Sequence, residues 1–463
     1  MNKLKVKSFF QLTSLFLVGV FVLTSGFGCK LTDAKTQSKM QPITLNYWSL
    51  WDDADAFTDI IKDYQTLHPN ITINYRKFRF DEYEQALLNA FAEDRGPDIY
   101  TIHNDWVQKY ETKLAPMPST IEMAYRFEEG TIQKQVIYRT VAKNSPTLLQ
   151  LKTNYPDAVY KDILLNNQVY GLPLSVESLV LFYNKDIMNS ANIAQPAFTW
   201  KDFQEHVTKM KQIDNKSNII QAGTAMGTCT NVNRCFDVAS IIMMQNMAQF
   251  GLSPIDENGS VNFTKNTINR SNPGLDAINF YLDFSNPVRA VYTWNKDMPN
   301  SLQAFYNGKV GYTFGYNYDI PTIRGQAPRL NFGTAKIPQI DAFYPVNYAS
   351  YWLQSVAKKS KYPNEAWDFV IFSASEKEAT KYLAKTNRPA ALRSLLDSQT
   401  QNEDTVAAVG QTLSAKNWYT GKNPQAAESA YNEMIDNLVN LPMGEKFTPF
   451  IENALSKINQ SLK

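Results

Sequence analysis

The sequence predicts an α/β fold that is built from more than one domain. Two observations predict it. At 463 residues the chain is longer than one hydrophobic core usually organises. From Pro42 onward, strand and helix patterns alternate along the chain. Alternation of this kind is typical of a parallel sheet flanked by helices, in which ligands bind beyond the carboxyl ends of the strands.

The first half of the mature chain carries this pattern most clearly. Residues 43–51 (ITLNYWSLW) alternate as a strand does, and residues 53–67 place apolar side chains on one helical face. A strand at 71–78, a helix at 81–94 and a short strand at 96–102 follow. We therefore expect the residues just after the first and third strands to lie at the ligand-binding edge of a sheet.

The second half repeats the alternation and ends in helices. Residues 199–210 (TWKDFQEHVTKM) predict a helix with a Thr cap, and residues 309–314 and 331–340 predict strands. Residues 363–375 (PNEAWDFVIFSAS) predict a further helix, and helical patterns dominate from there to the end. The chain has no internal repeat and no second transmembrane candidate.

The N-terminus predicts export. Three lysines precede the apolar stretch 15–23, which is too short for a mature membrane anchor. The following TSGFGC resembles the lipobox of bacterial lipoproteins, with Gly26 where Leu is usual. We expect a signal peptide at 1–28, lipid attachment at Cys29 and a flexible polar tether at 29–41. The alternative is an ordinary secretory signal in which Cys29 is a bystander.

Charge and cysteine content exclude several partners. Three of the 46 basic residues precede Cys29, which leaves 43 against 44 acidic residues and no basic run, so no nucleic-acid partner is expected. In an exported protein, Cys229 and Cys235 are expected to form a small disulfide loop. The three histidines are dispersed, so no metal site is expected.

Four segments together resemble a known family. Their order and spacing are similar to those of family 1 extracellular solute-binding proteins, the maltose-binding-protein-like receptors of ABC importers. The segments are YGLPLSVESLVLFYNKDI (170–187), FTWKDF (198–203), AFYNGKVGYTFGYNYDI (304–320) and the long run 358–395. The resemblance implies a periplasmic-binding-protein type II-like fold of two α/β lobes, a hinge of crossing strands and a ligand cleft between the lobes.

The resemblance also implies where the chain crosses between lobes. Lobe 1 would comprise 42–173 plus 341–388, and lobe 2 would comprise 178–337 plus 391–463. The hinge would comprise 174–177 and 338–340, with a third crossing near Arg388–Ala391. A hinge of this kind absorbs backbone rotation in a few residues.

A carbohydrate ligand demands aromatic rings for its C–H faces and polar side chains for its hydroxyls. Strand ends and family-matched positions offer this mixture. The candidate ligand-binding residues are Trp48, Asp52, Asn104, Asp105, Glu177, Trp294, Tyr316, Asn317, Tyr318, Tyr348 and Trp352, with Trp418 and Tyr431 as further positions.

Several of these candidates have a structural alternative. Trp48 would instead pack on the next helix, and Tyr348 and Trp352 would pack in a core. Glu177 would form a hinge hydrogen bond. Arg388 is expected to form a structural salt bridge rather than to contact ligand.

The expected function is a substrate-binding lipoprotein of an ABC transporter, anchored outside the cytoplasm, monomeric and without cofactor or catalytic residue. It would capture a carbohydrate, in particular an oligosaccharide, by hinge closure and deliver it to the membrane permease. One alternative is the same fold binding a polyamine, a metal chelate or a phosphodiester. Another is an exported glycoside hydrolase, which would need two converging carboxylates from among Asp52, Asp105 and Glu177.

Overall fold

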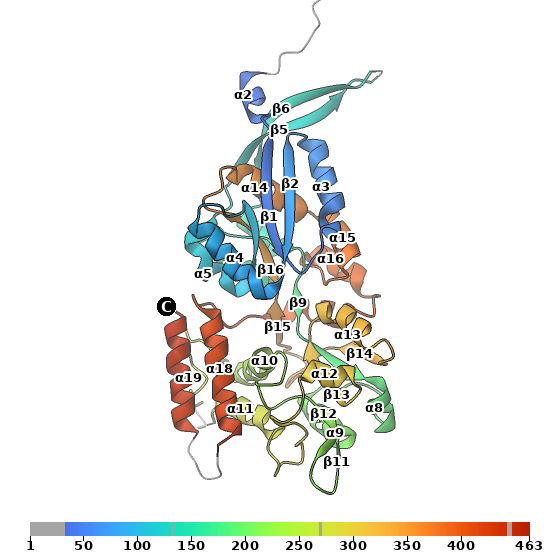
Figure 1. The fold of residues 1–463 in the computed structure, drawn as a ribbon. Helices are drawn as coiled ribbons and strands as arrows, with labels where there is room; N and C mark the ends of the chain where they lie inside the picture. Colours follow the sequence, from blue (N-terminus) through green and yellow to red (C-terminus); the bar gives the residue numbers. More distant parts are fainter. Residues whose placement is uncertain (1–32, 132, 268–270, 442–446) are drawn as a thin grey trace, which may run out of the picture.

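The computed structural model describes residues 33–131, 133–267, 271–441 and 447–463, so the predicted signal peptide and Cys29 lie outside the described residues. The described chain forms two α/β lobes stacked along one long axis and joined by a narrow waist (Figure 1). Within the described residues, no helix is both long and apolar enough to cross a bilayer.

Lobe 1 is built on a five-stranded sheet with the order β2-β1-β3-β16-β4. Its strands are β1 (Ile43–Leu50), β2 (Ile71–Phe78), β3 (Ile99–His103), β4 (Leu114–Ala115) and β16 (Trp352–Ala357). β1 pairs in parallel with β2 and β3, whereas β16 pairs antiparallel with β3. The predicted strand–helix alternation therefore gives a parallel sheet here, because each early strand returns through a helix.

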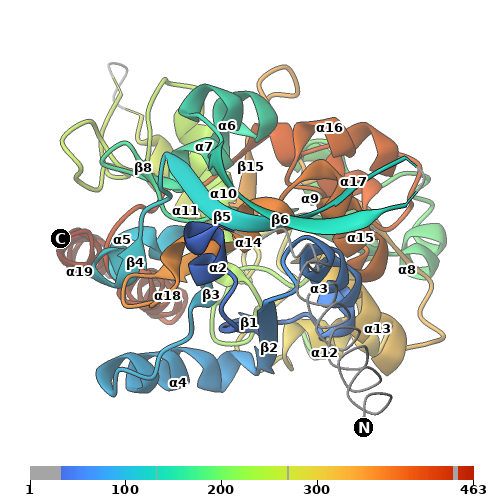
Figure 2. The same ribbon diagram turned by 90° about the horizontal axis from the view of Figure 1, so that it is seen from above.

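Helices cover the faces and edges of the lobe 1 sheet (Figures 1 and 2). They are α3 (Asp55–Leu67), α4 (Phe80–Ala92), α5 (Val107–Tyr110), α6 (Leu148–Asn154), α7 (Asp157–Asp162), α14 (Pro363–Ser373), α15 (Glu376–Thr386) and α16 (Arg393–Leu396). Two short strands, β7 (Leu164–Leu165) and β8 (Gln168–Val169), form a small hairpin before the hinge.

Lobe 2 is built on a mixed sheet with the order β11-β12-β13-β10-β14. Its strands are β10 (Val180–Asn184), β11 (Gln212–Ile213), β12 (Ile219–Thr224), β13 (Val310–Gly315) and β14 (Phe332–Ala335). Its helices are α8 (Lys185–Ser190), α9 (Trp200–Met210), α10 (Cys235–Ala248), α11 (Pro273–Asp283), α12 (Ser301–Tyr306), α13 (Ile320–Gln326), α17 (Val406–Val409), α18 (Pro424–Val439) and α19 (Thr448–Ser461).

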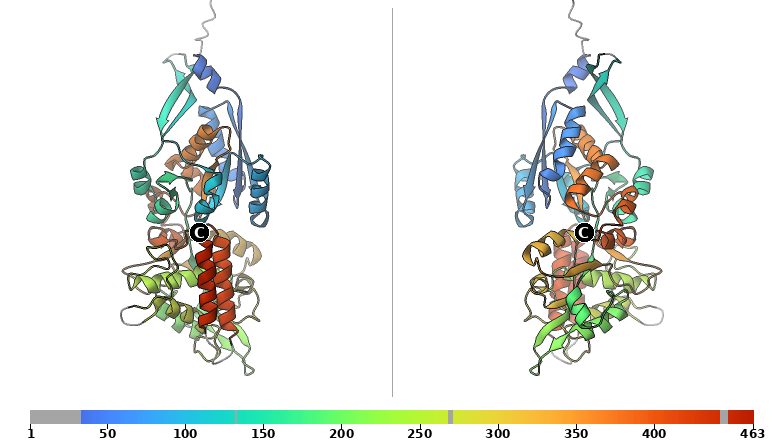
Figure 3. Two further views of the ribbon diagram at one scale, coloured as in Figure 1. Left: turned by 90° about the vertical axis from the view of Figure 1, so that its left-hand side faces the viewer. Right: turned by 90° about the vertical axis from the view of Figure 1, so that its right-hand side faces the viewer.

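α10 lies at the centre of lobe 2. Nearly all its residues are buried, which suits a helix that is apolar all round. α18 and α19 pack side by side at the edge of this lobe (Figure 3).

The return crossing lies later in the chain than the sequence analysis placed it. Residues 338–340 belong to lobe 2: the neighbouring Ile337 and Val346 pack in the lobe 2 core, and the Gln339 amide hydrogen-bonds within that lobe. The chain crosses instead at β15 (Asn347–Ser350), which pairs antiparallel with β9 (Glu177–Ser178). The prediction failed because IPQI is apolar and extended, a pattern that a core loop and a hinge strand share.

The third crossing is also displaced. Residues 389–391 run beside the first crossing, where the Val176 N–H bonds to the Pro389 carbonyl, but Ala390 and Ala391 pack in the lobe 1 core. α16 also packs in lobe 1, and the chain enters lobe 2 only at α17, whose Ala408 carbonyl accepts from Ser178 Oγ. β17 (Ala415–Lys416) then pairs with β15 and completes a three-stranded hinge sheet.

The predicted flexible tether is in part a docked helix. α2 (Ala34–Lys39) is capped by Asp33 and lies on the long hairpin of β5 (Thr120–Glu129) and β6 (Gln135–Asn144) at the end of lobe 1 far from the waist (Figures 1 and 2). Thr36 Oγ1 is buried and lies 2.8 Å from Thr140 Oγ1, and Lys35 pairs with Glu122. Composition alone missed this, because the helix is held by polar contacts rather than by an apolar face.

Candidate ligand-binding site

A cavity of about 570 Å³ lies between the lobes at the hinge. Lobe 1 contributes the residues that follow β1 and β3, the hinge contributes β9 and β15, and lobe 2 contributes loop residues and α18. The walls combine aromatic rings with charged groups, and the residues that carry the argument below all line it: Trp51, Asp52, Phe80, His103, Asp105, Glu177, Arg234, Asp237, Tyr318, Asp319, Tyr348, Trp352, Arg388 and Glu428.

A buried charge cluster forms the floor of the cavity at the hinge. Arg388 donates from Nε and Nη2 to Asp52 Oδ1 at 3.1 and 2.9 Å, and its Nη1 lies 3.5 Å from Glu177 Oε1. Tyr382 donates to the other Asp52 oxygen at 2.8 Å. The predicted salt bridge of Arg388 is therefore present, and it joins lobe 1 to the first crossing strand.

Glu177 is incompletely bonded in this cluster. Its Oε2 accepts from the Asn317 backbone N–H of lobe 2 at 3.3 Å, whereas its Oε1 has no hydrogen-bond donor and is buried. Only 2% of Glu177 is exposed, yet it lines the cavity. Burial raises the pKa of Glu177 to about 7 in spite of the nearby Arg388 guanidinium.

Aromatic rings meet across the cleft at one end of the cavity. Trp51 of lobe 1 stacks on Tyr318 of lobe 2, with ring centroids 5.6 Å apart and planes inclined by 12°. On its lobe 1 side Trp51 stacks on Phe80, and Tyr318 stacks in turn on Tyr316. Trp51 has a left-handed backbone with φ of 66°, a conformation that costs a bulky residue energy and directs this ring across the cleft.

Trp352 forms a second aromatic surface. It is half-buried at the start of β16, and the rings of Trp51, Phe80, His103 and Trp106 meet it at steep angles. His103 Nδ1 lies 2.5 Å from Asp105 Oδ1, and its Nε2 lies 3.0 Å from Ser350 Oγ. The His103 imidazole thus holds the Asp105 carboxylate and also packs against the Trp352 ring.

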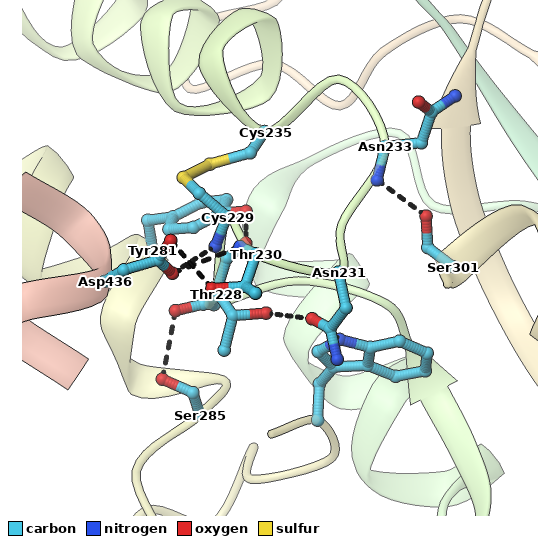
Figure 4. The surroundings of a disulfide bond; sticks show 12 residues. Thr228, Cys229, Thr230, Asn231, Asn233, Cys235, Tyr281, Ser285, Ser301 and Asp436 are labelled. Atoms are coloured by element: carbon cyan, nitrogen blue, oxygen red, sulfur yellow. Dashed lines mark hydrogen bonds between the residues drawn. A yellow bond between two sulfur atoms is a disulfide. The ribbon is translucent and has the colours of Figure 1, made fainter. Parts of the chain in front are cut away.

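Lobe 2 contributes Arg234 through a disulfide loop. A disulfide joins Cys229 and Cys235 (Figure 4). Arg234 directly precedes the second cysteine in the sequence. Arg234 has a left-handed backbone with φ of 61° and donates from Nε to Asp237 Oδ2 at 2.6 Å. Its guanidinium also lies over the Tyr316 ring, 5.1 Å from the centroid.

Further contacts hold this loop against the rest of lobe 2 (Figure 4). Asp436 of α18 accepts hydrogen bonds from the backbone N–H of Cys229 at 2.8 Å and from the Thr230 hydroxyl at 2.8 Å. The Asn233 N–H donates to Ser301 Oγ at 2.8 Å. The disulfide and these bonds together position Arg234 in the cavity wall.

The structure brings six predicted ligand-binding residues to the cavity: Asp52, Asp105, Glu177, Tyr318, Tyr348 and Trp352. Tyr348 is almost fully buried and packs with the lobe 2 core, so it presents only part of its surface.

The other five predicted residues do not line the cavity. Trp48 packs on Phe78 within lobe 1, because successive strand residues face opposite sides of the sheet and its neighbours Tyr47 and Ser49 are the ones that line the cavity. Asn104 is buried and donates to Asp162 at 2.8 Å, while its carbonyl oxygen accepts from the Tyr351 N–H.

Three predicted residues of lobe 2 likewise point inward. Trp294 is fully buried and donates to Asn231 at 3.0 Å, so its polar sequence surroundings were misleading. The Tyr316 hydroxyl donates to Asp237 at 2.8 Å beneath Tyr318. The Asn317 side chain is buried and donates to the Asp404 carbonyl at 2.7 Å.

The list of predicted ligand-binding residues omitted other residues that line the cavity. Trp51 lies within the predicted ligand-binding edge, between Leu50 and Asp52, but it was not selected as a ligand contact. Arg234 had a weaker signal, its place inside the disulfide loop. Phe80 and Glu428 lie on helix surfaces where nothing in the local pattern distinguishes them from solvated residues.

The chain is similar in sequence to sugar-binding proteins of other bacteria. The multiple sugar-binding protein of Streptococcus mutans is 23% identical over 399 residues, covering 83% of each chain. The galactooligosaccharide-binding protein of Bacillus subtilis is 23% identical over 389 residues, covering 82% of this chain and 81% of the relative.

Solved structures show the same fold. The cyclic alpha-maltosyl-1,6-maltose binding protein of Arthrobacter globiformis superposes with a TM-score of 0.68 at 17% identity, covering 91% of this chain and 99% of the other. The sugar-binding protein MalE of Xanthomonas citri gives 0.67 at 17% identity, covering 90% and 97%. The predicted two-lobed α/β fold is thereby confirmed.

A family model described as bacterial extracellular solute-binding protein matches residues 59–408. The match spans most of both lobes and all of the first hinge strand, and it confirms the resemblance found in the sequence. The chain belongs to the bacterial extracellular solute-binding protein family.

Proposed function

We propose that this protein is the substrate receptor of an ABC importer and that it captures a carbohydrate, in particular an oligosaccharide, in the cavity between its lobes. Its work is binding and delivery, with no chemical step. The relatives whose names mention sugars or oligosaccharides support this substrate class.

The observation that carries the proposal is the pairing of aromatic surfaces with polar groups on both sides of one cavity. Trp51 and Trp352 come from lobe 1, Tyr318 comes from lobe 2, and Tyr348 comes from the hinge strand β15, where it packs on the lobe 2 core. Rings of this kind stack on the apolar faces of a pyranose, while Asp105, Asp237 and Arg234 can bond its hydroxyls. A volume of about 570 Å³ lies within the range of roughly 300–1,000 Å³ that small-molecule sites occupy.

Ligand capture would proceed by closure of the lobes around the hinge sheet. A ligand that contacts both lobes stabilises the closed arrangement by its differential affinity for that state. The Trp51–Tyr318 stack already joins the two lobes, and the Glu177–Asn317 bond joins the hinge strand β9 to lobe 2 at the residue before Tyr318. Ligand entry and release would therefore require the Trp51–Tyr318 stack to separate.

Membrane attachment would be provided by a lipid on Cys29. α2 begins at Ala34, so about four residues would separate the lipid from the helix docked on the β5–β6 hairpin. An extended chain of that length reaches about 15 Å. The receptor would then stand on the membrane through lobe 1, with the permease as its docking partner.

The test is calorimetric titration of the mature chain with mono- and oligosaccharides, polyamines and phosphodiesters, with thermal unfolding as a screen. A saccharide that binds the folded state raises Tm as its concentration exceeds Kd. Trp352→Ala should abolish measurable binding of that saccharide, and the matched control Trp294→Phe, outside the cavity, should retain it. Binding of charged solutes alone would contradict the carbohydrate proposal.

A further inference from the structure

A second hollow opens from the cavity, between helix α4 of lobe 1 and helix α18 of lobe 2. It has a volume of about 400 Å³ and is called the side groove below. Phe80, Trp106 and Gln425 line both the cavity and the side groove, so the two spaces are continuous. The side groove is lined further by residues of α4 and α5, among them Glu84, Leu88 and Lys109.

The face of α4 toward the side groove carries exposed apolar side chains. Phe80, Glu84 and Leu88 are spaced four residues apart and therefore lie along one stripe of the helix. Phe80 is 54% exposed and Leu88 is 38% exposed, although both are large and apolar. The helix packs on lobe 1 through other residues, including Tyr83 and Leu87. The stripe is therefore available to a ligand.

Phe80 connects this stripe to the aromatic surfaces of the cavity. Its ring stacks on Trp51, with centroids 5.4 Å apart and planes inclined by 23°, and it meets Trp352 edge-on at 6.3 Å. Trp51 is itself 37% exposed. An apolar surface thus continues from the cavity over Phe80 toward Leu88. Exposed apolar surface that lines a groove is typical of a binding site.

Polar groups from both lobes lie along the same groove. The ammonium group of Lys109 in lobe 1 lies 2.5 Å from Glu84 Oε1 and donates to Gln425 Oε1 of lobe 2 at 3.2 Å. It also lies over the Trp106 ring, 4.8 Å from the centroid. These contacts leave one ammonium donor, and the amide nitrogen of Gln425, without a hydrogen-bond partner among the described residues.

The side groove therefore offers the two kinds of group that the cavity offers. Its apolar stripe suits the C–H face of a sugar ring, and its free donors suit sugar hydroxyls. Phe80 and Trp106 belong to the walls of both spaces. A chain-like ligand can consequently pass from one space to the other while it stays in contact with the same rings.

We infer that the ligand is a linear oligosaccharide whose chain runs out of the cavity over Phe80 and continues in the side groove between α4 and α18. This inference rests on the proposed carbohydrate function and specifies the length and course of the substrate. A sugar unit in the side groove contacts Leu88 of lobe 1 and Gln425 of lobe 2. Each unit that reaches the groove therefore adds contacts to both lobes and favours the closed arrangement.

The experiment measures affinity as a function of chain length. The mature chain is titrated calorimetrically with linear series, from disaccharide to hexasaccharide, of α-1,4-linked glucose and of β-1,4-linked glucose, galactose and mannose. We expect one series to bind at least about tenfold more tightly at its longest member than at its shortest. The gain should level off once the chain extends past the side groove.

Site variants show whether the gain with length comes from the side groove. Leu88→Asp should weaken binding of the hexasaccharide about fivefold and leave the disaccharide affinity within about twofold. Leu88 lines the side groove but not the cavity. The matched control is Leu149→Asp on α6, an exposed leucine of lobe 1 outside both spaces, which should change neither affinity.

The outcomes distinguish this inference from the proposed function. Disaccharides that bind as tightly as hexasaccharides overturn the inference and leave carbohydrate binding standing. A gain with length that Leu88→Asp leaves intact also overturns it, because the chain then leaves the cavity by another route. Binding of no saccharide in any series overturns the carbohydrate proposal and the inference together. A gain that Leu88→Asp abolishes and Leu149→Asp preserves supports both.

Discussion

The two walls of the cavity are built in different ways. The lobe 1 wall is built around one edge of a sheet, where the antiparallel pairing of β3 with β16 fixes His103 opposite Trp352 and where Asp52 lies two residues beyond β1. The lobe 2 wall consists of a disulfide loop, a short turn and a helix surface, which present Arg234, Tyr318 and Glu428. One wall is therefore held by backbone pairing and the other by side-chain cross-links.

This difference predicts which lost contacts should destabilise each wall. A sheet edge tolerates the loss of a single side-chain contact, except where a charge is buried within it. A loop depends on its few cross-links, so the loss of one should loosen the wall locally. The predictions below test this contrast from the largest expected effect to the smallest.

The largest effect is expected at the buried hinge cluster. Arg388→Ala leaves Asp52 and Glu177 buried without their cation and should lower the free energy of unfolding by about 3–5 kcal/mol. Urea unfolding followed by circular dichroism measures this. The control is Arg324→Ala, which removes an exposed pair with Asp404 and should cost about 1 kcal/mol or less. Similar losses in the two variants would contradict the role of the cluster.

The next effect is a pH dependence at the same place. The folded protein holds the Glu177 proton more tightly than the unfolded chain, since its pKa is about 7 instead of 4.5. Stability from this group is therefore full below pH 4.5 and is lost as pH rises to 7, by up to about 3 kcal/mol. The difference in unfolding free energy between the wild type and Glu177→Gln should change over this window.

Asp162 provides the comparison within lobe 1. Burial raises its pKa to about 6. The difference in unfolding free energy between the wild type and Asp162→Asn should therefore finish changing about one pH unit lower than the difference for Glu177→Gln. A wild-type curve that runs parallel to that of Glu177→Gln from pH 4 to 8 would show that the Glu177 pKa is not raised.

The third effect concerns the lobe 2 wall. Replacing Cys229 and Cys235 by serine opens the loop and should cost about 2 kcal/mol of stability. Hydrogen exchange should rise at 229–237 and remain unchanged at the ends of β1 and β3. Exchange that rises equally in both lobes would remove the distinction between a cross-linked wall and a sheet-built wall.

The smallest effect concerns two tryptophans, Trp48 within β1 and Trp51 directly after it. Trp51→Ala removes the stack on Tyr318 across the cleft and should weaken saccharide binding about fivefold, equivalent to about 1 kcal/mol. Trp48→Ala, which removes a ring packed on Phe78, should lower Tm without changing affinity. Calorimetric titration measures the saccharide affinity of both variants. Equal affinities of Trp51→Ala and Trp48→Ala would contradict a role of the Trp51–Tyr318 stack in binding.

The contrast between the walls also explains what the sequence could predict. Asp52 and Asp105 were found because the carboxyl ends of parallel strands gather at one edge, and the strand pattern locates those ends. Arg234 and Glu428 were not found, because their places depend on how a loop and a helix pack against distant segments. Local periodicity contains no information on such packing.

The wrong placements have the same origin. Trp294 and Tyr316 carry the residue type that suits a sugar site, but their rings are fully buried and their polar atoms bond to lobe 2 side chains. The return crossing was placed at 338–340 because an apolar extended segment fits a hinge or a core loop equally well. Only the pairing of β15 with β9 distinguishes the two.

The central claim is that one saccharide binds between the lobes and contacts both of them. The most direct measurement is a crystal structure of the mature chain with the tightest saccharide of the calorimetric panel. The account predicts a sugar ring stacked on Trp352 or Trp51 from lobe 1, with contacts from Tyr318 or Arg234 of lobe 2. A saccharide bound to one lobe alone, or outside this cavity, would contradict it.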